Sequence, residues 1–259
     1  METHIQQHAQ AVRARFRRAL LVSLAFVALI GGIHFAAPWL GGLRGLALVP
    51  QHGPGLVGVL FAPLLHGSSG HWLANASALL ILGPLVGTVY PRATVRALPL
   101  IWLLSGLGTW IIGQPSFHIG ASGLTHGLMF LLLCLGLLRR DRAAIAAALI
   151  AFFFFGGMLL TVLPREPGVS WEYHLCGALA GILAAWLWRR ADPEPPRRLY
   201  SWEETPEAFE ADPELELPGP DRVPVLWQRP DTDDTGVVLP FRPRQPPQAP
   251  AGPESGPDR

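Results

Sequence analysis

Long apolar stretches separated by short polar connections dominate the first 190 residues. Each stretch holds about 17–25 mostly apolar residues, enough for a helix to cross the hydrocarbon core of a bilayer. Six such stretches predict six transmembrane helices, at 19–37, 71–89, 95–113, 119–138, 143–163 and 172–188. The pattern therefore predicts an all-α membrane protein, a six-helix bundle. Several stretches are rich in glycine, which in lipid usually marks helices that pack backbone to backbone.

Composition and charge support this class and predict its orientation. Half of the residues are apolar and only 15% are charged, which is unusual for a soluble protein. Arginines gather in every second connection: Arg13, Arg15, Arg17 and Arg18, then Arg92 and Arg96, then Arg139, Arg140 and Arg142, then Arg189, Arg190, Arg197 and Arg198. Because positive connections stay in the cytoplasm, we expect both ends of the chain to be cytoplasmic. The compact six-span plan without organelle-targeting features favours a bacterial inner membrane, with a eukaryotic origin as the alternative.

Three segments of different character follow one another. A cytoplasmic N-terminal segment, 1–18, precedes the six-span domain, 19–190, and a proline-rich acidic segment, 191–259, follows it. The last segment holds sixteen prolines and has a formal charge of −8, against +9 for residues 1–190. Such a composition buries too little apolar surface to fold, so we expect a disordered cytoplasmic tail. Two short apolar islands, 223–227 and 237–241, leave open a second interpretation, docking motifs for a cytoplasmic partner.

Three reactive side chains are predicted to share one depth in the membrane. The second, fourth and sixth stretches begin at the outer face, and they carry His71, Ser122 and His174 near their starts. Polar side chains inside a bilayer are costly, and they usually mark function. A serine hydroxyl is a weak nucleophile until a base removes its proton, and His174 is a candidate base for Ser122. Taken alone, however, a serine between glycines is more often a packing residue.

Glycines next to these residues predict a close helix contact. His174, Gly177 and Gly181 lie on one face of the sixth stretch. The fourth stretch carries Gly123 and Gly127, four residues apart. We expect the two helices to approach closely enough for a direct hydrogen bond between Ser122 and His174.

The second stretch supplies candidate donors for a developing oxyanion. His71 and Asn75 are four residues apart and share a helix face. Acyl transfer needs hydrogen-bond donors at the carbonyl oxygen as its charge develops. The backbone N–H of Ser122, near a helix start, is a third candidate. The other interpretation of His71 and Asn75 is a helix cap or a hydrogen bond between helices.

These motifs together resemble the rhomboid family of intramembrane serine proteases. The resemblance rests on Gly120-Ala-Ser-Gly123, His71-x-x-x-Asn75 and His174-x-x-Gly177-x-x-x-Gly181, each in the expected stretch, and it covers about residues 15–190. It implies a catalytic dyad of Ser122 and His174 without a third acid. It also implies an oxyanion hole of His71, Asn75 and the Ser122 amide, supported by Gly120, Gly123, Gly177 and Gly181.

The resemblance also implies roles for two further histidines. His66 matches a loop histidine common in the family and is expected to shape that loop. His126 stands where the family usually has a tyrosine packed on the catalytic histidine, so it is expected to pack against His174. The resemblance also implies a gate at the 164–171 loop and the adjoining part of the fifth stretch.

The function predicted is that of a serine endopeptidase that cleaves single-span membrane proteins near the outer face. Its chemistry needs no cofactor, and its surroundings are the lipid bilayer rather than nucleic acid. A non-proteolytic relative that holds membrane clients is the alternative, although such proteins generally lack the serine or the histidine. A transporter with a histidine relay would spread polar residues across the membrane. A metalloprotease is disfavoured, because the chain has no His-Glu-x-x-His motif and no Cys/His cluster with zinc-ligand spacing.

Overall fold

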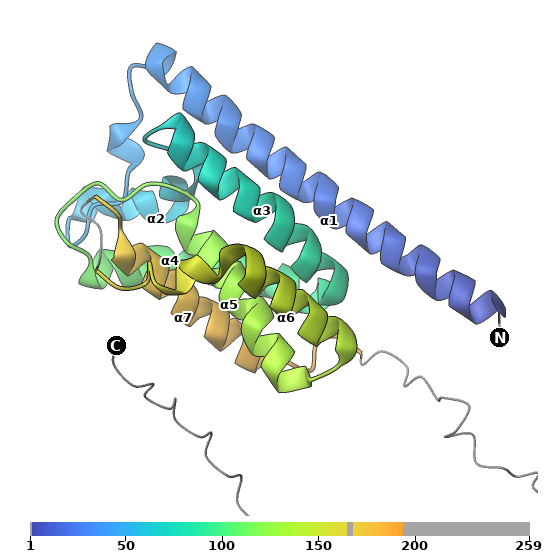
Figure 1. Ribbon diagram of the computed structural model, residues 1–259. Coiled ribbons are helices and arrows are strands. Elements are labelled where there is room, and N and C mark those ends of the chain that lie inside the picture. Colours follow the sequence, from blue (N-terminus) through green and yellow to red (C-terminus); the bar gives the residue numbers. More distant parts are fainter. Residues whose placement is uncertain (1, 165–167, 194–259) are drawn as a thin grey trace, which may run out of the picture. The chain divides into compact units, whose positions relative to one another are not determined.

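A computed structural model describes residues 2–164 and 168–193 as a bundle of helices (Figure 1). The helices are α1 (Glu2–Ala36), α2 (Gly58–Phe61), α3 (Ser69–Val89), α4 (Pro91–Ile112), α5 (Ser122–Arg139), α6 (Arg142–Phe155) and α7 (Trp171–Trp188). No strand occurs in this part of the chain, apart from an isolated bridge between Leu48 and His118. Nearly all of the predicted tail, and part of the predicted gate loop, lie outside the described residues.

Five helices in the described part of the chain are long and apolar enough to cross a membrane. These spans are Gln6–Leu40, Ser69–Val89, Pro91–Ile112, Ser122–Arg139 and Arg142–Leu159. The remaining long helix, α7, has 18 residues but carries Glu172 in its first turn. The chain is therefore an integral, multi-pass membrane protein, and the predicted helical membrane bundle is confirmed.

Several helix boundaries differ from the predicted ones, and three of these differences have a clear local reason. α1 reaches back to Glu2, because the polar segment before residue 19 is made mostly of good helix formers. α5 begins at Ser122 rather than at residue 119, because Gly120 has a φ of 116° that no helix contains. α6 ends at Phe155, where Gly156 and Gly157 open a 3₁₀ turn, Gly156–Leu159.

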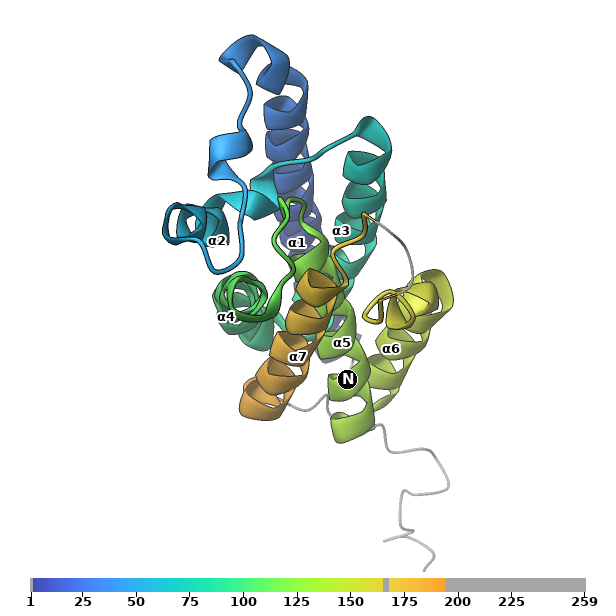
Figure 2. The same ribbon diagram turned by 90° about the vertical axis from the view of Figure 1, so that its left-hand side faces the viewer.

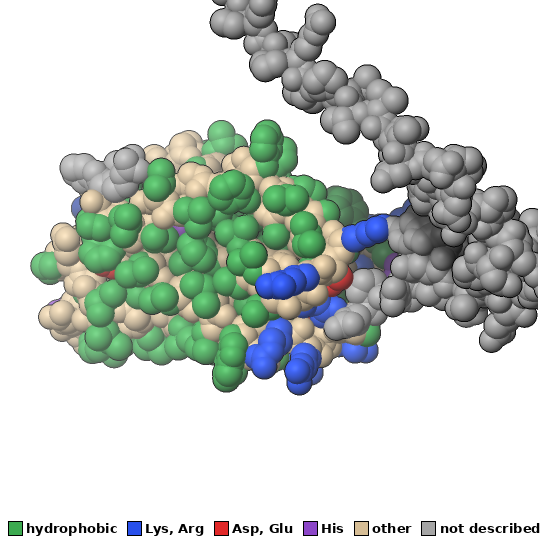
Figure 3. Space-filling model, turned by 60° about the horizontal axis from the view of Figure 1, so that its bottom comes forward, with side chains coloured by type: hydrophobic (Ala, Val, Ile, Leu, Met, Phe, Trp, Pro, Cys, Tyr) green, Lys and Arg blue, Asp and Glu red, His purple; other side chains and the backbone are tan. Residues whose placement is uncertain are grey.

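The centre of the bundle is α5. It packs against α3, α4, α6 and α7, and Figure 2 shows it surrounded by them. Its side chains supply much of the core, including Leu128, Met129, Leu131, Leu132 and Leu135. The outer helices turn large apolar side chains outward, such as Phe153 of α6, which is 83% exposed. An apolar exterior of this kind (Figure 3) is suited to lipid rather than to water.

The arginine-bearing helix ends meet at one end of the bundle. The Asp192 carboxylate accepts hydrogen bonds from the backbone N–H groups of Arg92 and Ala93, both at 2.9 Å, at the start of α4. Arg139 at the end of α5 donates to the Asp192 carbonyl at 2.7 Å. In the view of Figure 3 the Arg side chains cluster accordingly. We call this the arginine end, and the opposite end, where α3, α5 and α7 begin, the serine end.

Candidate active site

The first turns of α3, α5 and α7 carry the predicted site residues at the serine end. Ser122 is the first residue of α5, His71 the third of α3 and His174 the fourth of α7. The structure buries most of these side chains, since Ser122 and His174 are each 9% exposed and Asn75 is 4% exposed. A buried site of this kind strengthens every electrostatic interaction inside it.

α5 and α7 touch through the predicted glycines. A Cβ atom on Gly177 would lie 2.1 Å from the Gly123 carbonyl oxygen, and one on Gly181 would lie 2.2 Å from the Gly127 carbonyl oxygen. No larger residue fits at either position without separating the helices. The expected backbone contact between these two helices is therefore present, and it carries the starts of α5 and α7 toward each other.

The ring of His174 has a defined orientation. Its Nδ1–H donates to the backbone carbonyl of Thr161 at 3.0 Å. Because a carbonyl can only accept, the proton of the neutral ring lies on Nδ1, and Nε2 keeps its lone pair. Thr161 follows the 3₁₀ turn after α6. Sequence reasoning missed it, and the only sequence signal was a hydroxyl-bearing residue near the end of the fifth stretch.

His126 packs on the His174 ring and links it to Ser122. The two rings are stacked, with centroids 4.0 Å apart and planes 12° apart. Nδ1–H of His126 donates to the Ser122 carbonyl at 2.7 Å, and its Nε2 lies 2.9 Å from the Thr161 hydroxyl. His126 therefore takes the packing position expected of the family's tyrosine and adds a polar contact on each side of its ring.

The Ser122 hydroxyl and the His174 ring form no hydrogen bond among the described residues, so the expected direct contact is not made in this structure. Such bonds are often long or poorly aligned before substrate binds, and they tighten in the complex. The two residues instead share His126, which contacts the backbone of one and the ring of the other.

The candidate oxyanion donors lie around Gly120. A Cβ atom on Gly120 would lie 2.5 Å from both Cε1 and Nε2 of His71 and 3.7 Å from Nδ2 of Asn75. Glycine therefore keeps both side chains beside the start of α5. One N–H of the Asn75 amide donates to the His71 carbonyl at 3.0 Å, and an amide nitrogen carries a second N–H. The Ser122 N–H, in the first turn of α5, has no partner within its own helix.

His66 lies in the connection before α3 and lines the same region. Its ring meets the His71 ring edge to face, with centroids 5.1 Å apart. Both ring nitrogens are buried without a hydrogen-bond partner in the described structure. Burial, and then the neighbouring His71 and His34, lower the pKa of His66 to about 4. His66 is therefore neutral near pH 7 and acts as a packing group in this connection.

Polar contacts fix the loops around the site, and sequence reasoning missed them. Glu172, 2% exposed, accepts a hydrogen bond from the backbone N–H of Gln114 at 3.2 Å. His118 hydrogen-bonds to the Ser170 hydroxyl, just before α7. Both contacts tie the α4–α5 connection to the start of α7, and so fix the first turn that carries His174. The described residues contain no group of three or more potential metal ligands.

Comparison with known proteins gives the same family as the sequence motifs. A family profile described as Rhomboid domain matches residues 54–191, more than half of the chain. A Mycobacterium tuberculosis protein described as uncharacterised is 43% identical over 147 residues, which are 53% of this chain and 61% of that protein. A Mycobacterium leprae protein with the same description is 40% identical over 141 residues, 51% of this chain and 56% of that protein.

A more distant relative carries the family's name. A protein of Acanthamoeba polyphaga mimivirus, described as a rhomboid protein, is 24% identical over 135 residues, 49% of this chain and 72% of that protein. The chain spans only about 61% of the length of the Mycobacterium tuberculosis relative that it matches. On the profile match and the helical membrane bundle together, the chain belongs to the rhomboid family.

Proposed function

We propose that this protein is an intramembrane serine endopeptidase with Ser122 as nucleophile and His174 as base. The observation that carries the proposal is the orientation of the His174 ring. A carbonyl of Thr161 accepts from Nδ1 at 3.0 Å, and the stacked ring of His126 supports it at 4.0 Å. The lone pair on Nε2 is then free to accept the proton of a nucleophile.

In the proposed reaction the Ser122 oxygen attacks the carbonyl carbon of the scissile peptide bond while its proton passes to Nε2 of His174. The oxyanion accepts hydrogen bonds from His71, Asn75 and the Ser122 N–H. His174 then gives the proton to the leaving amine, and an acyl ester remains on Ser122. Water, deprotonated by the same ring, hydrolyses this ester and restores the serine.

The neighbours of His174 suit this cycle. The ring becomes an imidazolium twice per turnover, and it then keeps its Nδ1–H bond to the Thr161 carbonyl. A carbonyl oxygen carries partial negative charge, so it stabilises the cation without an acid. Glu172 is the nearest acid along α7, but it accepts from the Gln114 N–H and is not needed as a third member.

The proposed substrates are single-span membrane proteins. A membrane helix hides its peptide groups in internal hydrogen bonds, so we expect cleavage where such a helix is weakened by glycine, proline or serine near the serine end. By the arginine rule the serine end faces the outside. Entry past α6 and the 164–171 loop follows from the family resemblance, and part of that loop lies beyond the described residues.

A client-binding protein without peptidase activity is the second candidate. One observation favours it: in the described structure the Ser122 hydroxyl and the His174 ring are not hydrogen-bonded. Against it stands the presence of both residues, with supporting groups around each. A direct test of the nucleophile separates the two.

The test is co-expression with a tagged single-span substrate panel, read by immunoblot, together with labelling of the purified protein by a fluorophosphonate. We expect Ser122→Ala to abolish cleavage and labelling, and His174→Ala to reduce cleavage about 10³-fold or more. Ser77→Ala is the matched control, because Ser77 is an exposed α3 serine whose hydroxyl bonds only its own helix at Ala74. Cleavage that survives Ser122→Ala, or client binding without any labelling, would overturn the proposal.

A further inference from the structure

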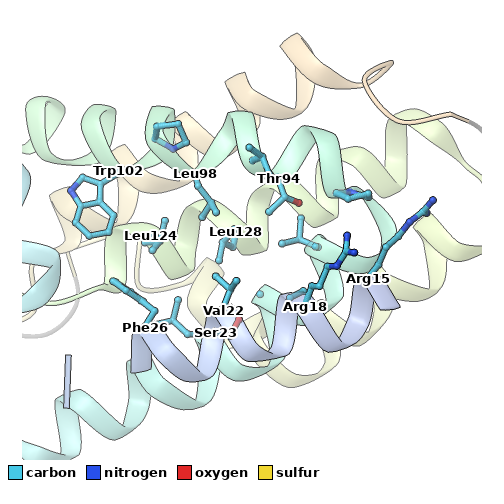
Figure 4. Close-up of a pocket in the computed structure, with 18 of the residues that line it drawn as sticks. Arg15, Arg18, Val22, Ser23, Phe26, Thr94, Leu98, Trp102, Leu124 and Leu128 are labelled. Carbon is cyan, nitrogen blue, oxygen red and sulfur yellow. The ribbon is translucent and has the colours of Figure 1, made fainter. Parts of the chain in front are cut away.

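A cavity of about 720 Å³ lies between α1, α3, α4 and α5, apart from the candidate active site (Figure 4). It exists because α1 packs along α3 and not along α4. Small residues bring α1 onto α3: a Cβ atom on Gly83 would lie 2.2 Å from the Ser23 hydroxyl, and one on Gly87 would lie 2.7 Å from the Ala19 side chain. The space left between α1 and α4 is the groove.

One stripe of α1 lines this groove. Arg15, Arg18, Val22 and Phe26 all contribute, at spacings that keep them on one face of a helix. The walls supplied by the other helices are apolar, with Leu98 of α4 and Leu128 of α5 among them. The groove therefore offers an apolar channel that ends at two guanidinium groups.

The two ends of the groove differ. Toward the serine end the rings of Phe26 and Trp102 meet edge to face with centroids 5.8 Å apart, and the Trp102 indole N–H donates to the Leu60 carbonyl at 3.2 Å. At the arginine end, Arg15 and Arg18 are exposed, and Figure 4 shows both at the end of the lining that lies away from Phe26 and Trp102. The described residues provide no ion-pair partner for either one.

We propose that this groove binds one anionic glycerophospholipid from the leaflet at the arginine end. An acyl chain fills the apolar channel, and the phosphate meets Arg15 and Arg18. Guanidinium groups bind phosphate oxygens well, and basic side chains next to a span attract anionic headgroups. The match of an apolar channel with a doubly positive mouth is the charge complementarity that selects this ligand.

The size of the cavity argues against a substrate helix as its occupant. The cavity holds about 720 Å³, which suits alkyl chains and falls in the usual range for small-ligand pockets. The Phe26–Trp102 contact also stops a long segment from passing through.

The test is native mass spectrometry of the full-length protein in detergent, with phosphatidylglycerol or phosphatidylcholine added at equal concentration. We expect phosphatidylglycerol to be retained at least tenfold more strongly. Arg15→Gln with Arg18→Gln should lower its retention to the phosphatidylcholine level. The control is Arg13→Gln with Arg17→Gln, which removes the same charge from the opposite side of α1 and should leave retention unchanged.

Two further arms identify the lipid as the source. Val22 is 64% exposed on the groove side of α1, so Val22→Trp should block the chain and lower retention while both arginines remain. Inorganic phosphate should not compete with phosphatidylglycerol at millimolar concentration, because it lacks a chain to bury. Equal retention of the two lipids, equal loss in both arginine pairs, or competition by phosphate would overturn the proposal. So would a photo-crosslinker at Val22 that captures substrate rather than lipid.

Discussion

At His174 a backbone carbonyl occupies the place that a carboxylate holds in a three-residue catalytic triad. The Thr161 carbonyl sets the ring tautomer through a 3.0 Å hydrogen bond, and the His126 ring sets its plane. A carbonyl brings only a partial negative charge, so the proposed dyad would rely on orientation of the ring more than on charge. Because His126 orients the ring of His174, substitutions at His126 test how much that orientation matters.

We expect His126→Phe to keep the stacking surface and to lose both polar contacts. A neutral hydrogen bond contributes about 1 kcal/mol, so the loss of two should lower cleavage by about thirtyfold at most. His126→Ala removes the ring as well and should cost at least a further tenfold. Initial rates on one substrate in reconstituted vesicles would measure this. Complete loss in the Phe variant with recovery in His126→Gln would show instead that the polar contacts are essential.

Gly120 is required for two independent reasons. Its φ of 116° is strained for any residue with a side chain, and an added Cβ would lie 2.5 Å from the His71 ring. We expect Gly120→Ala to lower the free energy of unfolding by about 1–3 kcal/mol and to abolish cleavage. Thermal unfolding in detergent would measure the first. Gly32→Ala is the control, since nothing lies within 4 Å of the added carbon there; a Gly120→Ala variant as active as that control would refute this.

The sequence singled out Ser122, His174, His71 and Asn75 as candidate site residues, because their chemistry is unusual in an apolar helix. Sequence reasoning missed Thr161, which acts on His174 through its backbone, because every residue has a carbonyl and no pattern marks the one that is used. The polar contacts of His126 could not be predicted from the sequence either. A histidine that only packs and a histidine that also forms hydrogen bonds look the same in a sequence.

At the scale of elements, the glycine contact between α5 and α7 is the tightest helix crossing at the site. This contact could be predicted from the sequence, because its glycines recur at helical intervals, at Gly123, Gly127, Gly177 and Gly181. The ends of the helices were harder to predict. The start of α5 depends on the backbone conformation of Gly120, and the end of α6 depends on Gly156 and Gly157. A glycine does not interrupt a run of apolar residues, so the length of the run does not show where these helices end.

We expect Gly177→Ala to force α7 away from α5, because the added carbon would lie 2.1 Å from the Gly123 carbonyl oxygen. Overpacking of this kind typically lowers the free energy of unfolding by about 1–3 kcal/mol, and the displaced His174 should reduce cleavage more than stability. Circular dichroism melts and cleavage rates would be compared in one detergent. Leu179→Ala, at a 55% exposed position of the same helix, should change stability by less than about 0.5 kcal/mol. Equal behaviour of the two variants would contradict this account.

For the whole molecule, the alternation of arginine-rich connections along the chain agrees with the arrangement of helix ends. Successive long helices run in alternating directions between the arginine end and the serine end. The side of the membrane that each end faces follows only from the arginine rule. The 194–259 segment lies outside the described residues, so its predicted disorder stays a prediction.

Cysteine labelling would test the orientation. In a Cys134→Ala, Cys176→Ala background, Pro115→Cys lies at the serine end and Ala143→Cys at the arginine end, and both positions are exposed. We expect a membrane-impermeant maleimide to label the first in intact spheroplasts and the second only after the membrane is opened. The reverse pattern would place the candidate active site on the cytoplasmic side.

The packing of α1 along α3 has a consequence for biogenesis. α1 is synthesised before α3, the long helix that it packs along in the described structure, and more than thirty residues separate the two. During that interval it must persist in lipid as a solitary helix, which its length and internal hydrogen bonds allow. α1 then packs on α3 only after this delay. Slower translation of residues 37–68 would lengthen the delay without unfolding α1.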